Sequence, residues 1–201
     1  MLAKVASLLR GVWLLRNPEL VKALGDWRQS IELLNAIKKS CPGAILHQEV
    51  VVQGWPQGKL ILAKDVQVEK GSVLALGDDF NGYGTLEVGE GTWIGQYNNF
   101  RLSGGTHISI GEGCLVSQFC TLVATNHRVD RSTPIQQSPC DLDKANIEIG
   151  DDVWIGAGAA IMPSVNIGKG AVVGANSVVT RSVPEYEIWA GAPACKIGER
   201  I

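Results

Sequence analysis

The stretch IGDDVWIGAGAAIMPSVNIGKGAVVGANSVVTRSV, residues 149–183, decides the fold because it repeats with a period of six. An aliphatic side chain stands at every sixth position: Ile149, Ile155, Ile161, Ile167, Val173 and Val179. Four positions after each comes a small or β-branched residue: Val153, Ala159, Val165, Ala171, Ser177 and Val183. A short repeat of fixed period is the sequence signature of a solenoid.

The same rule continues upstream in interrupted blocks. Aliphatic residues keep the six-residue spacing at Ile110, Val116 and Leu122, at Val88 and Ile94, and at Leu62 and Val68. Their partners four positions later are Cys114, Cys120 and Asn126, then Thr92 and Asn98, then Val66 and Ser72. The repeat therefore extends over most of the chain.

Side-chain alternation predicts the geometry of each repeat. The first position is apolar and faces the core, and the fifth faces the core as well because it lies two residues before the next aliphatic. The sixth position then points outward, and the second to fourth positions turn the chain, where Gly, Asp, Asn and Lys gather. Short strands joined by such turns predict an all-β fold, a parallel β-helix.

This pattern resembles the hexapeptide-repeat acyltransferases over roughly Leu60 to Ile201. The resemblance implies a left-handed β-helix with three hexapeptides, about 18 residues, in each coil. The left hand is implied by the resemblance alone, since it opposes the usual right-handed crossover. We assign residues 44–201 to this domain, with a loop excursion at 128–148.

The N-terminal residues 1–43 are expected to form a helical extension. Pro18 follows Asn17 at a first helical turn, and apolar residues recur at helical spacing up to Ile37, before Cys41-Pro42-Gly43 ends the helix. Arg10 splits the apolar run of Met1–Leu15, so neither a signal peptide nor a spanning helix is expected. Met1–Arg28 carries five basic and two acidic residues, which makes a peripheral membrane contact a further expectation.

Composition excludes several classes of protein. The 201 residues carry a net charge of −2, so there is no basic surplus for a general nucleic-acid binder. Hydrophobic residues at 45% and charged residues at 19% exclude a disordered tail. Five cysteines without CxxC pairs argue against a disulfide framework or a structural zinc, which predicts a reducing, cytoplasmic location. Of the five, only Cys140 is expected to be exposed, because it lies in the loop.

The repeat is most informative where it breaks. Ile110–His127 fits one coil, and the next clean coil starts only at Ile149. His127 holds a sixth position and is expected to point outward beside the loop, where histidine is the natural general base near neutral pH. Asn99 and Trp154 also hold sixth positions, so three outward side chains are candidates for a site.

The residues around this break resemble the galactoside, maltose and capsular-polysaccharide O-acetyltransferases. The resemblance implies that His127 is the catalytic base, that Asn99 holds the reacting groups and that Trp154 packs beside coenzyme A. It also implies coenzyme contacts at Ala157, Ala175, Thr180 and Arg181, and at Lys196, because Cys195 replaces a basic residue of the family. It further implies acetyl-CoA as co-substrate, no metal, a carbohydrate acceptor and a homotrimer with its sites between subunits.

The function predicted is acetyl-CoA-dependent O-acetylation of a sugar hydroxyl in surface polysaccharide or lipopolysaccharide biosynthesis. Alternatives are an N-acetyltransferase acting on an amino sugar or an antibiotic, and a non-catalytic hexapeptide scaffold. A γ-class carbonic anhydrase shares the fold, but it needs three histidines on zinc, and the candidates are only His107 and His127.

Overall fold

The computed structural model describes Gly11 and residues 16–201. The chain divides into two compact units, Met1–Ser40 and Cys41–Ile201. The expectation that Met1–Leu15 holds no signal peptide falls almost wholly outside the described residues, and so does about half of Met1–Arg28, for which a membrane contact was expected. Among the residues described, no helix is both long and apolar enough to cross a membrane.

The first unit contains the helix α2, Pro18–Ser40. It begins where expected, because the Asn17 side chain accepts hydrogen bonds from the backbone N–H groups of Glu19 and Leu20, at 3.0 and 3.1 Å. Leu34 and Ile37 are buried, whereas Leu24 and Trp27 on the same apolar stripe are exposed.

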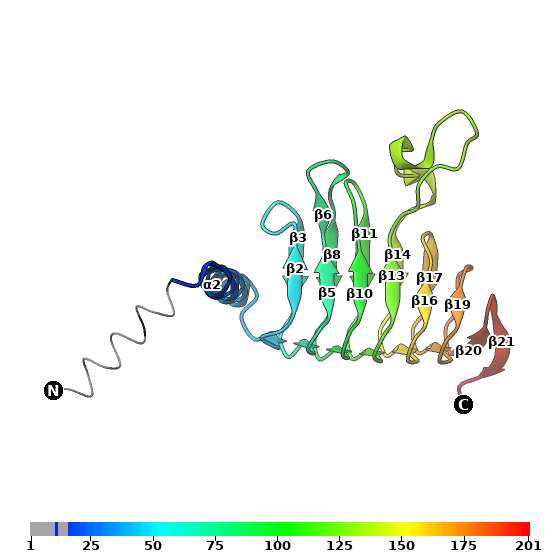
Figure 1. The fold of residues 1–201 in the computed structure, drawn as a ribbon. Coiled ribbons are helices and arrows are strands. Elements are labelled where there is room, and N and C mark those ends of the chain that lie inside the picture. The colour runs from blue at the N-terminus through cyan, green and yellow to red at the C-terminus, as the bar shows by residue number, and fades with distance from the viewer. Residues whose placement is uncertain (1–10, 12–15) are drawn as a thin grey trace. The chain divides into compact units, whose positions relative to one another are not determined.

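The second unit is a parallel β-helix whose strands line up in three sheets (Figure 1). Sheet A has eight strands, the last of which is antiparallel to its neighbour. In spatial order they are β1 Ile45–Leu46, β4 Gln67–Val68, β9 Trp93–Ile94, β12 Leu115–Val116, β15 Trp154–Ile155, β18 Val172–Val173, β20 Glu187–Gly191 and β21 Ala194–Glu199.

Sheets B and C complete each coil. Sheet B contains β2 Val51–Gln53, β5 Val73–Ala75, β10 Asn99–Arg101, β13 Thr121–Val123, β16 Ala160–Ile161 and β19 Val178–Val179. Sheet C contains β3 Lys59–Leu62, β8 Thr85–Val88, β11 His107–Ile110, β14 Ile147–Ile149 and β17 Val165–Ile167. The predicted β-helix of hexapeptide repeats is confirmed, with about six coils.

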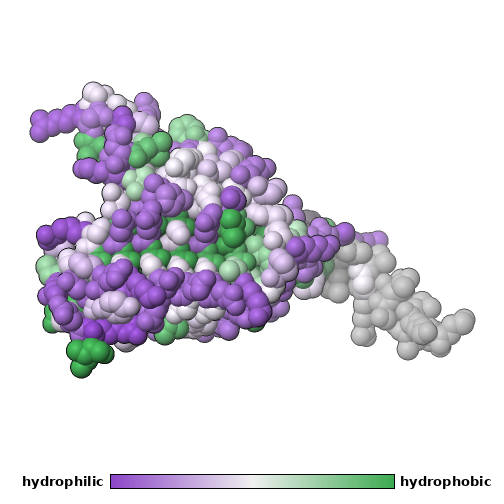
Figure 2. All heavy atoms as spheres, turned by 180° about the vertical axis from the view of Figure 1, so that it is seen from behind, coloured by the Kyte–Doolittle hydropathy of each residue, from purple (hydrophilic) through white to green (hydrophobic). Residues whose placement is uncertain are grey.

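The predicted inward positions form the core. From residue 149 to 183, every first-position aliphatic and every fifth-position residue is at most 4% exposed. The buried Asn98 side chain is hydrogen-bonded: it donates to the Gly95 carbonyl of its own coil at 2.8 Å and accepts from the Cys120 N–H of the next coil at 2.7 Å. Figure 2 shows one face of the molecule, on which an apolar band lies between hydrophilic margins.

The three corners of the coil differ in length. Four residues join sheet A to sheet B in every coil, and four join sheet C to sheet A. The B-to-C corner instead holds residues 54–58, 76–84, 102–106, 124–146 and 162–164 in successive coils. The second of these carries the hairpin of β6 Gly77–Asp78 and β7 Gly82–Tyr83. All insertions therefore project from one corner, which is seen along the top of Figure 1.

The excursion begins and ends earlier than predicted. The Asn146 N–H donates to the Ala124 carbonyl at 2.7 Å, which closes the coil across the loop. Ile147 and Glu148 already belong to β14, paired with β11. His127 therefore lies on the loop and not at the last position of a coil. The prediction that Asn126 is interior was wrong: Asn126 is exposed, because the chain has left the coil after Ala124.

Candidate active site

His127 is held on a short two-stranded segment inside the loop. Residues 126–128 run antiparallel to residues 139–141, with a bridge between His127 and Cys140. The Arg128 N–H donates to the Pro139 carbonyl at 2.9 Å, and the Asp141 N–H donates to the Asn126 carbonyl at 2.7 Å. The exposed histidine is thus fixed by backbone hydrogen bonds on both sides.

The tautomer of His127 follows from its partner. Nδ1 of His127 lies 2.7 Å from the carbonyl oxygen of Ser138. A carbonyl can only accept a hydrogen bond, so Nδ1 carries the proton and a neutral ring has its lone pair on Nε2. Ser138 is itself buried, and its hydroxyl bonds to the Arg128 carbonyl. Sequence reasoning missed Ser138, because only the folded loop brings it beside the histidine.

Asn99 lies on sheet B, on the coil before the loop. It pairs with Val73 on one side and Thr121 on the other, and its side chain is half-buried. Its Oδ1 atom is buried without a hydrogen-bond partner among the described residues. An amide left unsatisfied in this way is suited to bind a polar group of a ligand.

Trp154 lies on sheet A and is 51% exposed, as its outward position predicted. Its Nε1 donates to the Ser117 hydroxyl at 3.2 Å, and it pairs with the exposed Leu115 of the neighbouring strand. The indole ring therefore presents an apolar surface next to the corner that leads to sheet B.

Ala157 and Ala175 occupy equivalent places at the A-to-B corner of successive coils. Neither residue's N–H donates a hydrogen bond within the described part of the chain. Among the described residues, the N–H of Gln118, one coil earlier, donates no hydrogen bond either, but glutamine has a longer side chain than the two alanines. Two open donors one coil apart fit the amide carbonyls of a pantetheine arm.

The predicted basic residues are not equivalent. Arg181 is exposed and, within residues 16–201, has no ion pair, so its guanidinium is available for a phosphate. Thr180 precedes it, also exposed, beyond the end of β19. Lys196, on β21, already pairs with Glu187 at 2.8 Å and with Glu199. These hydrogen bonds raise the pKa of Lys196 and occupy its ammonium group.

The predicted site residues divide over two faces of the chain. Asn99 and the His127 loop belong to sheet B and its far corner. Trp154, Ala157 and Ala175 belong to sheet A and to the corner between sheets A and B. Within one chain, the structure therefore places the predicted site residues in two separate groups.

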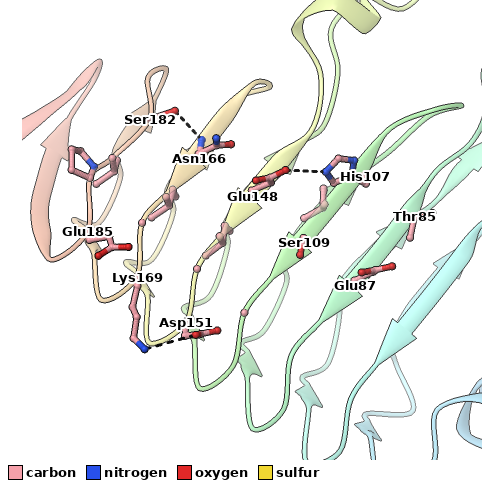
Figure 3. Close-up of a pocket in the computed structure, with 18 of the residues that line it drawn as sticks. Thr85, Glu87, His107, Ser109, Glu148, Asp151, Asn166, Lys169, Ser182 and Glu185 are labelled. Atoms are coloured by element: carbon pink, nitrogen blue, oxygen red, sulfur yellow. Dashed lines mark hydrogen bonds and ion pairs between the residues drawn. The ribbon is translucent and has the colours of Figure 1, made fainter.

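A groove over sheet C contains none of the predicted site residues (Figure 3). It has a volume of about 1120 Å³ and is lined by outward polar side chains of β8, β11, β14 and β17. Within it, His107 Nε2 lies 3.5 Å from Glu148 Oε1, and the Asn166 N–H donates to the Ser182 hydroxyl. The alternation of Thr85–Val88 and His107–Ile110 was a usable signal for these outward polar rows.

The cysteines differ from expectation at one position. Cys41, Cys114 and Cys120 are buried and Cys140 is partly exposed, but Cys195 is exposed as well. Cys195 was not foreseen because β21 leaves the coil and pairs only along one edge. In the described ranges, no group of three or more His, Cys, Asp or Glu side chains could hold a metal ion.

The chain is a hexapeptide β-helix with a histidine-bearing loop. Comparison with known proteins gives the same repeat. The family description "Bacterial transferase hexapeptide (six repeats)" matches residues 146–181. Galactoside O-acetyltransferase of Lactococcus lactis is 28% identical over 87% of this chain and 79% of that protein. A putative lipopolysaccharide biosynthesis O-acetyl transferase, WbbJ of Escherichia coli, is 30% identical over 58% of this chain and 61% of its own length.

Solved structures give the same fold. A mutant of AntD, an N-acyltransferase from Bacillus cereus in complex with dTDP and coenzyme A, has a TM-score of 0.68 at 21% identity, covering 83% of this chain and 89% of that one. Across four other curated relatives, the chain spans 50–63% of their lengths. The repeat segment of the chain thus matches a bacterial transferase hexapeptide model, and the chain is similar to acetyltransferases that share this repeat.

Proposed function

We propose that the protein transfers an acetyl group from acetyl-CoA to a sugar hydroxyl, with His127 as the general base. The observation that carries this proposal is the 2.7 Å contact between His127 Nδ1 and the Ser138 carbonyl, which directs the basic Nε2 to solvent at the loop. The names of the relatives in Lactococcus and Escherichia favour a sugar acceptor and a role in surface polysaccharide or lipopolysaccharide biosynthesis.

The chemistry needs few protein groups because a thioester is already activated. Nε2 of His127 takes the proton of the acceptor hydroxyl as its oxygen attacks the acetyl carbonyl carbon. The carbon–sulfur bond then breaks, and the proton on Nε2 passes to the departing sulfur. The unsatisfied Oδ1 of Asn99 would accept a hydrogen bond from the acceptor, and the NH2 of the same amide would donate to the reacting carbonyl.

Coenzyme A fits the residues at the A-to-B corner. The N–H groups of Ala157 and Ala175 would donate to the pantetheine amides, and Trp154 would cover its apolar part. Arg181 would meet the phosphates at the C-terminal end of the coils, where Lys196 is already committed to two carboxylates. The thioester end of the arm then points toward the earlier coils, which carry Asn99 and His127.

A complete site requires two copies of the chain. The His127 half-site and the coenzyme half-site lie on different sheets, so they meet only if sheet B of one copy faces sheet A of another. That contact is between unlike faces, and a threefold rotation would close it into a ring. We therefore propose a homotrimer with one site in each of its three grooves.

An acceptor screen with acetyl-CoA, which measures release of the free coenzyme A thiol, tests the function. Pyranosides without an amino group are expected to support release. Release with amino sugars alone would reassign the protein to N-acetylation, the chemistry named for AntD. Release with chloramphenicol alone, which offers hydroxyls and no free amine, would reassign the acceptor to an antibiotic. A folded protein that binds no acetyl-CoA and supports no release would be a scaffold.

A further inference from the structure

The A-to-B corner forms a column in which one residue of each coil has the left-handed conformation. Its members from the second coil onward have φ between 55° and 72°: Gly71, Tyr97, Phe119, Gly158 and Asn176. Each N–H donates to a backbone carbonyl of the coil before, at 2.8–3.2 Å: Gly71 to Glu49, Tyr97 to Lys70, Phe119 to Gln96, Gly158 to Gln118 and Asn176 to Ala157. The five residues are therefore stacked in register.

Because the backbone conformation is shared, the side chains of the column lean the same way, onto the preceding coil. A Cβ atom added at Gly71 would overlap the Tyr97 ring, and one added at Gly158 would overlap the Asn176 side chain. Phe119 in turn lies on Tyr97, with ring centroids 5.4 Å apart and planes within 6° of parallel. Each side chain of the column thus lies at the height of the preceding coil and not of its own coil.

Gly158 leaves one level of this column empty. The side chain of residue 158 would cover the outer face of Phe119, but glycine has none, and Phe119 is 61% exposed. The three heavy atoms nearest to the Cβ position of Gly158 all belong to Asn176, and none belongs to Phe119. Two levels of the stack, roughly 10 Å, therefore separate the Phe119 ring from the Asn176 side chain.

The side of this gap opposite Phe119 is formed by the polar side chain of Asn176. The Asn176 side chain is exposed and makes no hydrogen bond among the described residues. Its amide offers one acceptor and two donor hydrogens. The gap thus has the aromatic ring of Phe119 on one side and the amide of Asn176 on the other. This combination is suited to a ring with one apolar face and polar edges.

We infer that this gap is a subsite for the acceptor sugar, in which a pyranose lays its C–H face on Phe119 and bonds a hydroxyl to Asn176. The inference rests on the proposed function, because it places the ring beside Ala157, at the thioester end of the coenzyme arm. Phe119 and Asn176 would then select acceptors by shape, while His127 and Asn99 perform the transfer.

The test compares Phe119→Leu with Tyr186→Ala. Tyr186 is a matched control because it also has a left-handed φ, of 58°, and also leans on a glycine, Gly170, but at the C-to-A corner. Leucine keeps an apolar side chain at 119 but removes the flat face. For the best methyl pyranoside in the screen, Phe119→Leu is expected to raise KM about tenfold with kcat nearly unchanged, and Tyr186→Ala to leave both unchanged.

Four outcomes would overturn the inference: an equal effect of both variants on KM, a parallel loss of acetyl-CoA affinity by calorimetry, an equal loss for an open-chain alditol acceptor, and a change in oligomeric state. The last would assign Phe119 to a contact between copies.

Ligand-observed NMR with the methyl pyranoside, without acetyl-CoA, separates this inference from the proposed function. Binding that Phe119→Leu weakens about tenfold supports the gap even if no transfer occurs, and binding of unchanged strength contradicts it.

Discussion

At the scale of single residues, His127 and His107 each have one ring nitrogen engaged, but by different partners. His127 uses Nδ1 on a backbone carbonyl, whereas His107 uses Nε2 on the Glu148 carboxylate over sheet C. His127→Ala is expected to lower kcat by about 10² to 10⁴, because it removes the proposed general base, and to leave acetyl-CoA binding intact, because the residues proposed to hold the coenzyme lie on later coils. Steady-state kinetics and calorimetry measure the two effects.

His107→Ala serves as the control for this prediction. His107 is partly exposed, and its groove contains none of the residues assigned to transfer, so its loss is expected to change kcat far less. A folded His127→Ala protein with near-normal turnover would remove His127 from the mechanism.

The cysteines provide a prediction that depends on burial. Burial raises the pKa of both Cys114 and Cys120, so fewer of these thiols are ionised at a given pH. Alkylation of the native protein by iodoacetamide at pH 8 is expected to modify Cys195 first, then Cys140, and Cys114 and Cys120 only after unfolding. Peptide mass spectrometry gives the order, and early labelling of Cys120 would contradict the closed core.

Alternation along the sequence predicts which side chains face inward, but it cannot predict where the chain leaves a coil. Cys120 and Asn126 hold the same repeat position, yet one is buried and the other exposed. The difference depends on a hydrogen bond between Ala124 and Asn146, 22 positions apart, which no local pattern reveals. For the same reason, the outward direction of His127 was predicted and its partner Ser138 was not.

At the scale of elements, a single strand separates core from surface between neighbouring residues. In β18, Val173 is fully buried and Val172 is half-buried on the outer face. Val173→Ala is expected to lower the free energy of unfolding by about 2 kcal/mol, from lost burial and a residual cavity. Val172→Ala is expected to cost under about 1 kcal/mol. Urea unfolding compares the two, and equal costs would contradict the assigned register.

The loop of residues 124–146 is the element expected to meet the acceptor. Replacing residues 129–137 with a short glycine linker keeps His127 and Ser138 but removes the tip, including the 3₁₀ turn Ile135–Gln137. KM for the acceptor is expected to rise much more than the Kd for acetyl-CoA, because the coenzyme residues lie on other coils. An equal rise in both, with an unchanged circular dichroism spectrum, would show that the tip has no preference for the acceptor.

At the scale of the whole molecule, the division of the site over two faces predicts the assembly. Sheet A carries the exposed Leu115 and Trp154, and sheet B carries the exposed Val51, so both faces have apolar surface to bury. Multi-angle light scattering at micromolar concentration is expected to give about three times the 21.5 kDa chain mass. A fully active monomer under these conditions would contradict a site that is shared between two copies of the chain.

The confinement of every insertion to one corner has a practical consequence. Ala124 and Asn146 are joined by a 2.7 Å hydrogen bond, so the solenoid continues as if the intervening residues were absent. The B-to-C corner is therefore an attachment point at which foreign peptides of any length can be displayed without changing the pitch of the coils. The five-residue corner 54–58 offers the same opportunity three coils before the corner that carries His127. An epitope or fluorophore grafted there would report on the protein while leaving its chemistry untouched.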